Sequence, residues 1–476
     1  MKSLEFKRWI IAGLSFLLLG SLLVVAYVEA SKHREDGRPE PVVSAENKPC
    51  VDCHRQRSPG VVHQWETSKH AQNGIGCLTC HQARPGDSDD FMHEGARIAT
   101  IVSPRDCSRC HEREFREQQA SRHADAAHFV GSLDNFLGEI VEGSPAAIAG
   151  CQQCHGATVR VGEDGHLDPQ TWPNGGMGRI NPDGSKGSCA ACHYRHDFSL
   201  VIARSPETCG KCHMGPDHPQ IEIYNESKHG VRFATYRDDM QPGMALREWV
   251  VGVNYDQAPT CATCHMSATR NQPNTHDVGT RLSWTLRPVV STRQENWQER
   301  RTNMLDVCKS CHSRQWSENY FTQFDAYVDL YNTKFAMPAQ RIMNTLRERS
   351  LITPTPFDEH IEWVFYELWH HEGRRGRHGA AMMGPDFVQW HGAYEVARNF
   401  YTEFIPEVRH LAPDLADEVM RMPQHSWTTG LSAEQRRQIV EFYRARYGAG
   451  PGGVSDQGGT PDAGPPMRVL THDAGR

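Results

Sequence analysis

The sequence contains few of the apolar residues that build an ordinary hydrophobic core. Hydrophobic residues make up only 38% of the 476 residues, which is too little to explain one large core in a chain of this length. The sequence also lacks an excess of positive charge, because its formal net charge is −7. This balance argues against nucleic acid as a partner. The chain therefore needs a source of apolar surface other than its own side chains.

Cysteine is absent outside eight pentapeptides of the form CxxCH, which contain all sixteen cysteines. In each pentapeptide a histidine directly follows the second cysteine. The cysteine pairs are Cys50 and Cys53, Cys77 and Cys80, Cys107 and Cys110, Cys151 and Cys154, Cys189 and Cys192, Cys209 and Cys212, Cys261 and Cys264, and Cys308 and Cys311. The histidines that follow them are His54, His81, His111, His155, His193, His213, His265 and His312.

This pattern is the attachment site of c-type haem, in which each thiol adds to a haem vinyl group and the histidine binds the iron. Paired cysteines also bind zinc or close disulfides, but neither chemistry requires histidine at the next position. Histidine accounts for 27 of the 476 residues, so its presence in all eight motifs is not chance. We predict eight haem c cofactors, whose macrocycles supply the missing apolar surface.

The N-terminus carries an export signal. Three cations precede an apolar run from Trp9 to Val28, and its length approaches the roughly 20 residues that a membrane-spanning helix needs. Residues 28–30 also resemble a small-residue cleavage site, so a cleaved signal peptide is the alternative. We expect an uncleaved signal anchor over residues 1–30 that holds the protein at the inner membrane. Either alternative places the cysteines in the periplasm, where c-type haem is attached.

Composition divides the remaining chain into four parts. Residues 31–49 are charged and proline-containing, as in a linker. Residues 50–315 form the octahaem-binding domain, and their motifs begin 27, 30, 44, 38, 20, 52 and 47 residues apart, which leaves little room for sheet. Residues 316–447 contain no cysteine and show helical periodicity, whereas residues 448–476 are rich in Gly and Pro and are expected to be disordered. We therefore predict a mostly α, multihaem cytochrome c fold, with short helices and loops around eight haems and a long-helix C-terminal domain.

Other histidines are numerous enough to give most irons a second axial nitrogen. Three of them share a Ser-basic-His pattern, which ends in His70, His123 and His229, and His218 is held between two prolines near the sixth motif. We predict distal iron ligands at His70, His123, His196, His218, His229, His378 and His391. The roles of His63, His93, His128, His166 and His371 stay open. Polar contacts with haem propionates are the alternative for the histidines of the C-terminal domain.

Several segments resemble the octahaem hydroxylamine oxidoreductases. The resemblance rests on the eight CxxCH motifs and on CHMGPDHPQIEIYNESKHG, NTHDVG, EGRRGRHGAAMMGPD and WHGAYEVARNFYTEFIPE. It extends from Cys50 to about Tyr447. None of the motifs is CxxCK, in contrast to the multihaem nitrite reductases that use lysine at the active iron.

The resemblance implies a homotrimer in which the fourth haem, held by Cys151, Cys154 and His155, is active and has an open face. Relatives place an adjacent aspartate and histidine and a tyrosine over that face. His276 and Asp277 match the pair and Tyr320 matches the tyrosine, so we predict that these three are catalytic and that the pair shuttles protons. The alternatives are a loop pair in which Asp277 caps a helix, and a tyrosine that only packs.

Oxidative relatives also join a tyrosine of a neighbouring subunit covalently to the active haem. Tyr394 and Tyr401 lie in the corresponding domain, but Phe387 stands where a tyrosine is sought. We therefore expect an uncrosslinked haem and slightly favour the reductive direction. The predicted substrate is hydroxylamine or a small nitrogen oxide, and the predicted redox partner is a cytochrome or a quinone-linked membrane protein. A non-catalytic electron conduit and a tetrathionate or sulfite reductase are the alternative functions.

Overall fold

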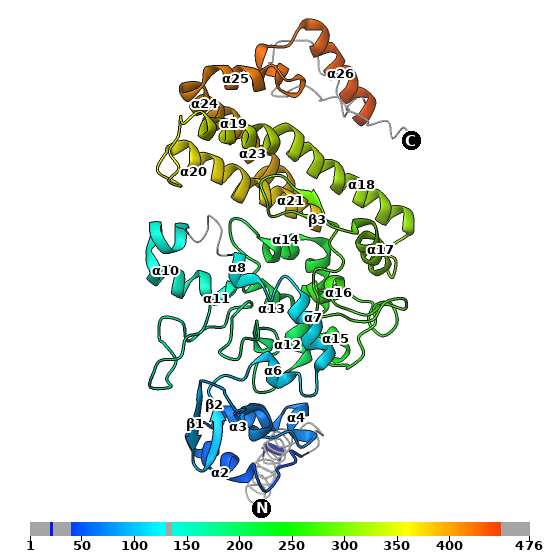
Figure 1. Ribbon diagram of the computed structural model, residues 1–476. Helices are drawn as coiled ribbons and strands as arrows, with labels where there is room; N and C mark the ends of the chain where they lie inside the picture. The colour runs from blue at the N-terminus through cyan, green and yellow to red at the C-terminus, as the bar shows by residue number, and fades with distance from the viewer. Residues whose placement is uncertain (1–19, 22–39, 130–135, 449–476) are drawn as a thin grey trace, which may run out of the picture.

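The computed structural model describes residues 20–21, 40–129 and 136–448 (Figure 1). Its described part is elongated, with the N-terminal motifs at one end and the C-terminal helices at the other. Helices predominate, and the strands of this part form two short antiparallel pairs: β1 (Asp90–His93) with β2 (Ala96–Ala99), and β3 (Trp284–Thr285) with β4 (Thr292–Arg293). The predicted mostly α fold is thereby confirmed.

Short helices build the motif-bearing region. They are α2 (Lys48–Arg57), α3 (Pro59–Glu66), α4 (Lys69–Gln72), α5 (Cys77–His81), α6 (Pro104–Cys107), α7 (Glu112–Ala120), α8 (Ala126–Phe129), η1 (Leu137–Gly143), α10 (Ser144–Ala149), α11 (Cys151–His155), η2 (Cys189–Ala191), α12 (Leu200–Arg204), α13 (Pro206–Gly210), α14 (Gln220–Glu226), α15 (Lys228–Met244), α16 (Cys261–His265) and α17 (Trp297–Cys308). Where a motif forms one helical turn, as in α5, α11 and α16, both cysteines and the histidine share one side of the helix.

The Ser-basic-His pattern begins helices in two of its three occurrences. Ser68 caps α4 by accepting a hydrogen bond from the Ala71 backbone N–H (3.1 Å), and Ser227 caps α15 in the same way through Gly230 (3.1 Å). Ser121 instead ends α7, and its hydroxyl donates to the Gln118 carbonyl at 2.6 Å. In the first two cases the serine cap places the next histidine, His70 or His229, at the second position of the helix.

Longer helices build the C-terminal domain, and π-helical turns interrupt them. The first runs through α18 (Arg314–Tyr331), η3 (Asn332–Ala336) and α19 (Met337–Glu348). The second runs through α20 (His360–Tyr366), η4 (Glu367–Glu372) and α21 (Gly373–Met382). The third runs through α22 (Pro385–Val388), η5 (Gln389–Tyr394), α23 (Glu395–Asn399), η6 (Phe400–Phe404) and α24 (Ile405–Leu411). The helices α25 (Pro413–Met420), η7 (Pro423–Thr429) and α26 (Ala433–Tyr447) follow.

Among the described residues, the largest hydrophobic core lies mainly in these C-terminal helices. Its fully buried members include Ile342, Leu346, Ile361, Leu368 and Phe400, from all three long helices. Burial of such side chains stabilises the domain by about 1.5–3 kcal/mol each. The motif-bearing region has smaller apolar clusters, such as that of Val51, Val62, Trp65 and Ala71.

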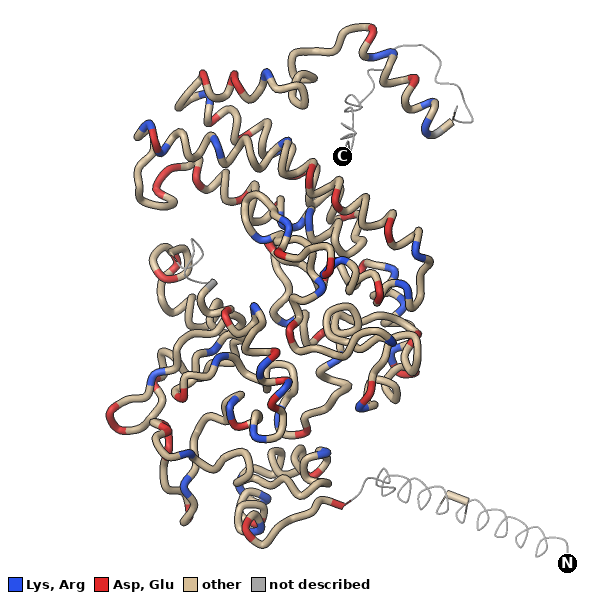
Figure 2. Tube along the Cα trace, turned by 45° about the vertical axis from the view of Figure 1, so that its right-hand side comes forward, with Lys and Arg blue, Asp and Glu red and all other residues tan. Residues whose placement is uncertain are grey.

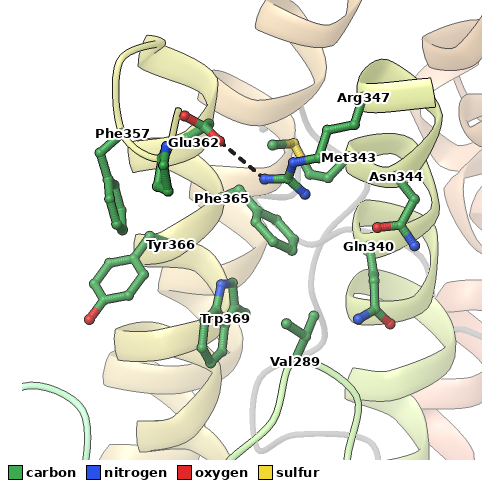
Figure 3. A pocket seen from close by; sticks show the side chains of 11 residues that line it. Val289, Gln340, Met343, Asn344, Arg347, Phe357, Glu362, Phe365, Tyr366 and Trp369 are labelled. Carbon is green, nitrogen blue, oxygen red and sulfur yellow. Dashed lines mark hydrogen bonds and ion pairs between the residues drawn. The ribbon is translucent and has the colours of Figure 1, made fainter. Parts of the chain in front are cut away.

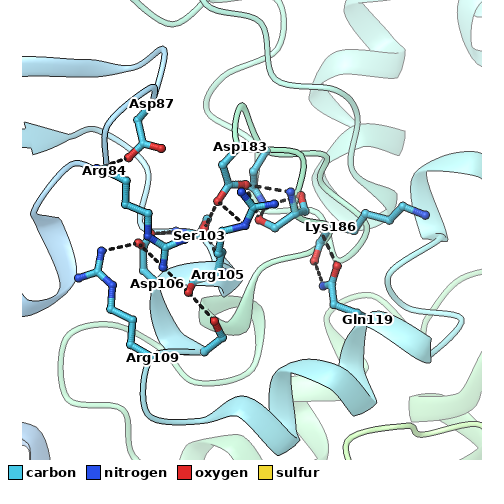
Figure 4. A network of polar contacts seen from close by, with 12 residues as sticks. Arg84, Asp87, Ser103, Arg105, Asp106, Arg109, Gln119, Asp183 and Lys186 are labelled. Atoms are coloured by element: carbon cyan, nitrogen blue, oxygen red, sulfur yellow. Dashed lines mark hydrogen bonds and ion pairs between the residues drawn. The ribbon is translucent and has the colours of Figure 1, made fainter.

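A polar network ties the second and third motifs to the loop before the fifth (Figure 4). The Ser103 hydroxyl donates to Asp183 at 2.7 Å, and Arg84 and Arg109 both pair with Asp106, at 3.5 and 3.1 Å. Figure 2 shows Lys and Arg interspersed with Asp and Glu along the described chain. Fixed local pairs of this kind hold loops that have little apolar surface to bury.

Within the described ranges, no helix combines the length and apolar character needed to cross a membrane. The predicted anchor at residues 1–30, apart from Gly20 and Ser21, and the predicted disordered tail after Gly448 lie outside the described residues.

Candidate haem centres and active site

Six of the eight motif histidines lie ring to ring with another histidine. The pairs, with the distances between ring centroids, are His54–His93 (6.0 Å), His81–His196 (6.5 Å), His111–His70 (6.3 Å), His193–His276 (6.4 Å), His312–His229 (6.1 Å), and His213 with both His123 (6.0 Å) and His218 (6.2 Å).

This spacing fits two imidazoles on opposite sides of one metal ion. A metal–imidazole bond is about 2 Å long, so two trans nitrogens are about 4 Å apart and the ring centroids about 6 Å apart. Direct ring packing is closer, as in the 4.2 Å stack of His312 on Trp316. The residues present therefore fit axial ligation of haem iron, with the motif thiols as the covalent anchors.

Burial keeps these imidazoles in the neutral form that binds a metal. It lowers the pKa of His213 to about 3 and the pKa values of His123 and His193 to about 4. Burial likewise lowers the pKa of His265, which interacts electrostatically with His123. An imidazole that resists protonation remains available to iron at acidic pH.

The other predicted distal ligands have different surroundings. His378 is half-buried, and desolvation together with the neighbouring Arg377 charge lowers its pKa. It interacts electrostatically with both His213 and His218. His391 is 46% exposed and faces carboxylates, Asp386 at 3.4 Å and Glu395 at 3.3 Å. Of the histidines left open by the sequence, His93 faces a motif histidine and His371 is hydrogen-bonded to Glu367 at 2.7 Å. His93 is exposed, and so are His63, His128 and His166.

Thiols from different motifs interact with each other. Four pairs interact directly through their side chains: Cys50 with Cys77, Cys107 with Cys189, Cys154 with Cys212, and Cys209 with Cys261. This interaction, together with burial, raises the pKa of the Cys107, Cys209 and Cys212 thiols. Electrostatic interactions link further pairs: Cys80 with Cys107, Cys192 with Cys209, and Cys264 with Cys308. The motifs therefore adjoin in the order first, second, third, fifth, sixth, seventh and eighth, and the fourth adjoins the sixth.

An Asp-His pair lies on the segment that leaves the sixth motif. Asp217 Oδ2 accepts a hydrogen bond from Arg374 at 3.0 Å, and Asp217 Oδ1 lies 3.5 Å from His218 Nε2. His370 Nε2 is 4.0 Å from Asp217 and accepts a hydrogen bond from Arg374 at 2.8 Å. The fourth motif is close by, because Cys154 contacts the sixth-motif residue Cys212. A carboxylate, two imidazoles and a guanidinium here form a set able to hold and exchange protons.

Helix α21 supplies the cations of this cluster. Arg374 is anchored by donating to the Arg287 carbonyl at 2.8 Å. Arg377 is 0% exposed, and its guanidinium donates only to neutral oxygens: the carbonyls of Gly373, Pro288 and Trp369 and the Ser291 hydroxyl. Because none of these acceptors is charged, a buried positive charge acts on the adjacent His378.

The three residues predicted as catalytic do not share one cluster of described contacts. His276 faces His193, and its backbone N–H donates to Glu117 at 2.7 Å. Asp277 accepts from the Gly279 N–H at 3.0 Å in a tight turn. The Tyr320 hydroxyl lies 2.9 Å from the Ala380 carbonyl and 2.5 Å from the Ala381 carbonyl, so it joins α18 to α21. Of the two tyrosines that are candidates for a crosslink, Tyr394 is exposed, and Tyr401 is hydrogen-bonded to His425.

Asp217 was not predicted as a site residue from the sequence, although a signal was present. The GPDHPQ segment contains an adjacent aspartate and histidine, as the NTHDVG segment does. Of this pair, only His218 was predicted, as an iron ligand.

The fold and the motif geometry define a class, the multihaem c-type cytochromes. A sequence model described as "Seven times multi-haem cytochrome CxxCH" matches residues 73–356, and the chain belongs to that family and carries haem c. A second model, "Cytochrome c554 and c-prime", matches residues 25–82.

Three known proteins are similar to the chain. The chain is 25% identical over 369 residues to a probable nitrite reductase-hydroxylamine oxidoreductase fusion protein of Kuenenia stuttgartiensis, a match that covers 64% of this chain but only 38% of that protein. A solved hypothetical multiheme protein superposes with a TM-score of 0.68 at 25% identity, covering 78% of this chain and 95% of the other. The reducing HAO-like protein complex of Kuenenia stuttgartiensis has the same fold, with a TM-score of 0.56 at 21% identity over 78% of this chain and 86% of that one.

Proposed function

We propose that the chain is an octahaem oxidoreductase that interconverts hydroxylamine with nitrite, nitric oxide or ammonium, with reduction slightly favoured. The observation that carries the proposal is that the fourth motif adjoins the sixth, and that the segment after the sixth motif carries Asp217, which pairs with the buried Arg374. The other motifs form a row with facing imidazoles, as expected of haems that relay electrons. The nitrogen chemistry of the Kuenenia relative supports the choice of substrate.

The fourth haem, held by Cys151, Cys154 and His155, is the proposed site of reaction. Bound haem supplies an iron that binds the nitrogen substrate and exchanges electrons with the row. Two imidazoles would hold each of the other irons. Five pairs face each other: His54–His93, His81–His196, His111–His70, His312–His229 and His193–His276. Although His123 and His218 also lie about 6 Å from His213, we assign His123 to His265 and His378 to His213, with which they interact electrostatically, so that His218 stays free.

Asp217 and His218 are the proposed proton-handling pair, in place of His276 and Asp277. His218 Nε2, the nitrogen that most often binds a metal, faces Asp217 at 3.5 Å. Arg374 orients the Asp217 carboxylate by donating a hydrogen bond to it at 3.0 Å. Reduction of hydroxylamine to ammonium consumes electrons and protons together, so a fixed carboxylate and imidazole beside the open iron accelerate it. Tyr320 takes a packing role in this scheme.

The decisive experiment is anaerobic turnover of hydroxylamine, once with an electron donor and once with an acceptor. We expect Asp217→Asn to lower the rate about 10²-fold, the low end of what acid–base groups supply. Asp386→Asn, an exposed carboxylate on α22, is the matched control and keeps the wild-type rate. Equal rates in all three proteins would remove the proton role from Asp217.

Spectroscopy separates the enzyme from an electron conduit. One high-spin haem among low-spin haems supports a reacting centre, whereas low-spin signals alone leave only electron transfer. Mass spectrometry of a digest tests the absence of a tyrosine crosslink to the CQQCH peptide. Turnover of tetrathionate or sulfite without turnover of hydroxylamine would favour sulfur chemistry.

We further propose a periplasmic homotrimer that is anchored by residues 1–30 and exchanges electrons with a cytochrome or a quinone-linked membrane protein. Its c-type haem motifs support export. Sedimentation of the detergent-solubilised full chain tests the trimer, and membrane fractionation tests the anchor.

A further inference from the structure

Three carboxylates meet where the loop after α19 enters helix α20. One oxygen from each of Asp358, Glu359 and Glu362 lies within 4.8 Å of the others. The three side chains run from exposed at Asp358 to buried at Glu362. None of them belongs to the haem motifs or to the Asp217 cluster.

Two buried oxygens of this group have no hydrogen-bond partner among the residues that the structure describes. Glu362 is 7% exposed, and its Oε1 accepts a hydrogen bond from Arg347 at 3.1 Å, whereas its Oε2 is buried and unpartnered (Figure 3). Glu359 Oε2 is also buried and unpartnered, although Glu359 Oε1 accepts a hydrogen bond from the Thr353 N–H at 2.5 Å. A buried anionic oxygen without a hydrogen-bond partner is unfavourable, so each of these two oxygens indicates a missing ligand.

Helix capping does not account for these groups. Glu359 occupies the N-cap position of α20, yet its side chain caps no backbone N–H of that helix. The local charges do not balance either. In the described part of this cluster there are three carboxylates, and the one cation paired with them is Arg347, which contacts Glu362. A divalent cation would neutralise the excess charge.

We propose that Asp358, Glu359 and Glu362 bind a calcium ion. All the ligand atoms are carboxylate oxygens, which hard cations prefer. Calcium accepts carboxylate oxygens at about 2.3–2.6 Å in a flexible geometry, whereas magnesium demands near-ideal octahedral geometry at about 2.0–2.1 Å. Three carboxylates from one loop end and one helical turn, with ligand atoms within 4.8 Å of one another, fit the more adaptable calcium ion. Water completes the coordination on the exposed side of Asp358.

Such an ion would fasten the loop to the domain core. Glu362 also lines a cavity of about 180 Å³ with Arg347, Phe357 and Tyr366 (Figure 3). Thr353 donates to Asp358 through its hydroxyl at 2.8 Å and to Glu359 through its backbone N–H. An ion bound by these carboxylates therefore links the start of the loop to the first turn of α20 and to α19.

Equilibrium dialysis of the chelator-treated haem-loaded full-length protein against radioactive calcium tests the site. We expect one ion per chain, a higher thermal midpoint with calcium, and about ten-fold or greater loss of affinity in Glu362→Gln and Asp358→Asn. Asp414→Asn, an exposed carboxylate paired with Arg349, is the control and binds as the wild type does. Unchanged far-UV circular dichroism shows that each variant is folded.

Three results would overturn the proposal: no calcium bound at millimolar concentration, equal binding by all variants, or magnesium binding as tightly as calcium. A further readout is stability without calcium. Glu362→Gln removes the unpartnered anionic oxygen, so the calcium-free variant should melt no lower than calcium-free wild type, and it should gain nothing when calcium is added.

Discussion

The rings of His193 and His276 lie 6.4 Å apart at an interplanar angle of 28°. His193 belongs to the fifth motif, whereas His276 lies in the segment after the seventh. Glu117 holds His276 in place by accepting a hydrogen bond from its backbone N–H. The Glu117 carboxylate also lies 3.8 Å from His276 Nδ1. A carboxylate beside the outer nitrogen of a metal-binding imidazole orients the ring and strengthens it as a ligand.

Replacement of His276 should therefore change one haem. We expect His276→Ala to retain its full haem content and to convert one low-spin signal into a high-spin signal, as seen by electron paramagnetic resonance. His391→Ala, which removes an exposed imidazole, serves as the control and leaves the spectrum unchanged. A wild-type spectrum from His276→Ala would show that another group fills that axial position.

Glu372 should make the protein less stable at alkaline pH. This residue is 5% exposed, and burial raises its pKa from 4.5 to about 7. The folded state thus binds its proton more tightly than the unfolded state, so this stability is fully present below about pH 4.5 and is lost as pH rises through 7. We expect Glu372→Gln to raise the free energy of unfolding by about 1–3 kcal/mol at pH 8 and by much less at pH 5. Calorimetry at both pH values checks this, with the exposed Glu403→Gln as control.

His425 should make the protein less stable at acidic pH. It is 0% exposed and shares a 2.7 Å hydrogen bond with Tyr401, and burial lowers its pKa from 6.5 to about 4. The unfolded state takes up this proton first, so the stability is present above pH 6.5 and is lost as pH falls through 4, by up to about 1.4 kcal/mol per pH unit. We expect His425→Phe to flatten this acid limb in thermal melts. Tyr401→Phe, which keeps His425 and removes the hydroxyl that bonds it and accepts from Trp427, should lower the midpoint and keep the slope. Parallel slopes in wild type and His425→Phe would contradict the assignment.

Two glycines allow helices α21 and η5 to touch. A Cβ atom added at Gly392 would lie 2.4 Å from the Gly376 Cα and 2.5 Å from the Phe387 carbonyl oxygen. Because both obstacles are backbone atoms, we expect Gly392→Ala to destabilise the fold by about 2–4 kcal/mol in denaturant unfolding. Gly60→Ala in α3 meets nothing within 4 Å and should be neutral or slightly stabilising.

The covalent haem sites and the helical C-terminal domain were accessible from the sequence for different reasons. A CxxCH motif is local, so its chemistry is complete within five residues. The long helices follow from apolar residues at a regular period, and residues such as Ile361 and Leu368 are indeed buried. The π-helical turns that divide these helices leave no such local signal and were not predicted.

The partners of the motif histidines were less accessible. His70 and His229 follow serine caps, which gave a local signal. His93 lies on a short strand and His276 in a loop, and each meets its partner only through the folding of distant segments. For Asp217, the decisive contact is with Arg374 on a helix of the other domain, which no local pattern reveals.

The touching thiols carry a consequence for the making of the protein. Cys107 and Cys189, Cys154 and Cys212, and Cys209 and Cys261 are contacts between different motifs. An oxidant that reaches a folded chain before its porphyrins arrive would join these sulfurs to each other. Such a crosslink would consume one anchor from each of two sites. Haem attachment must therefore be faster than folding of the chain. The enzymes that attach the haems have to act on this polypeptide while it is still extended and its thiols are reduced.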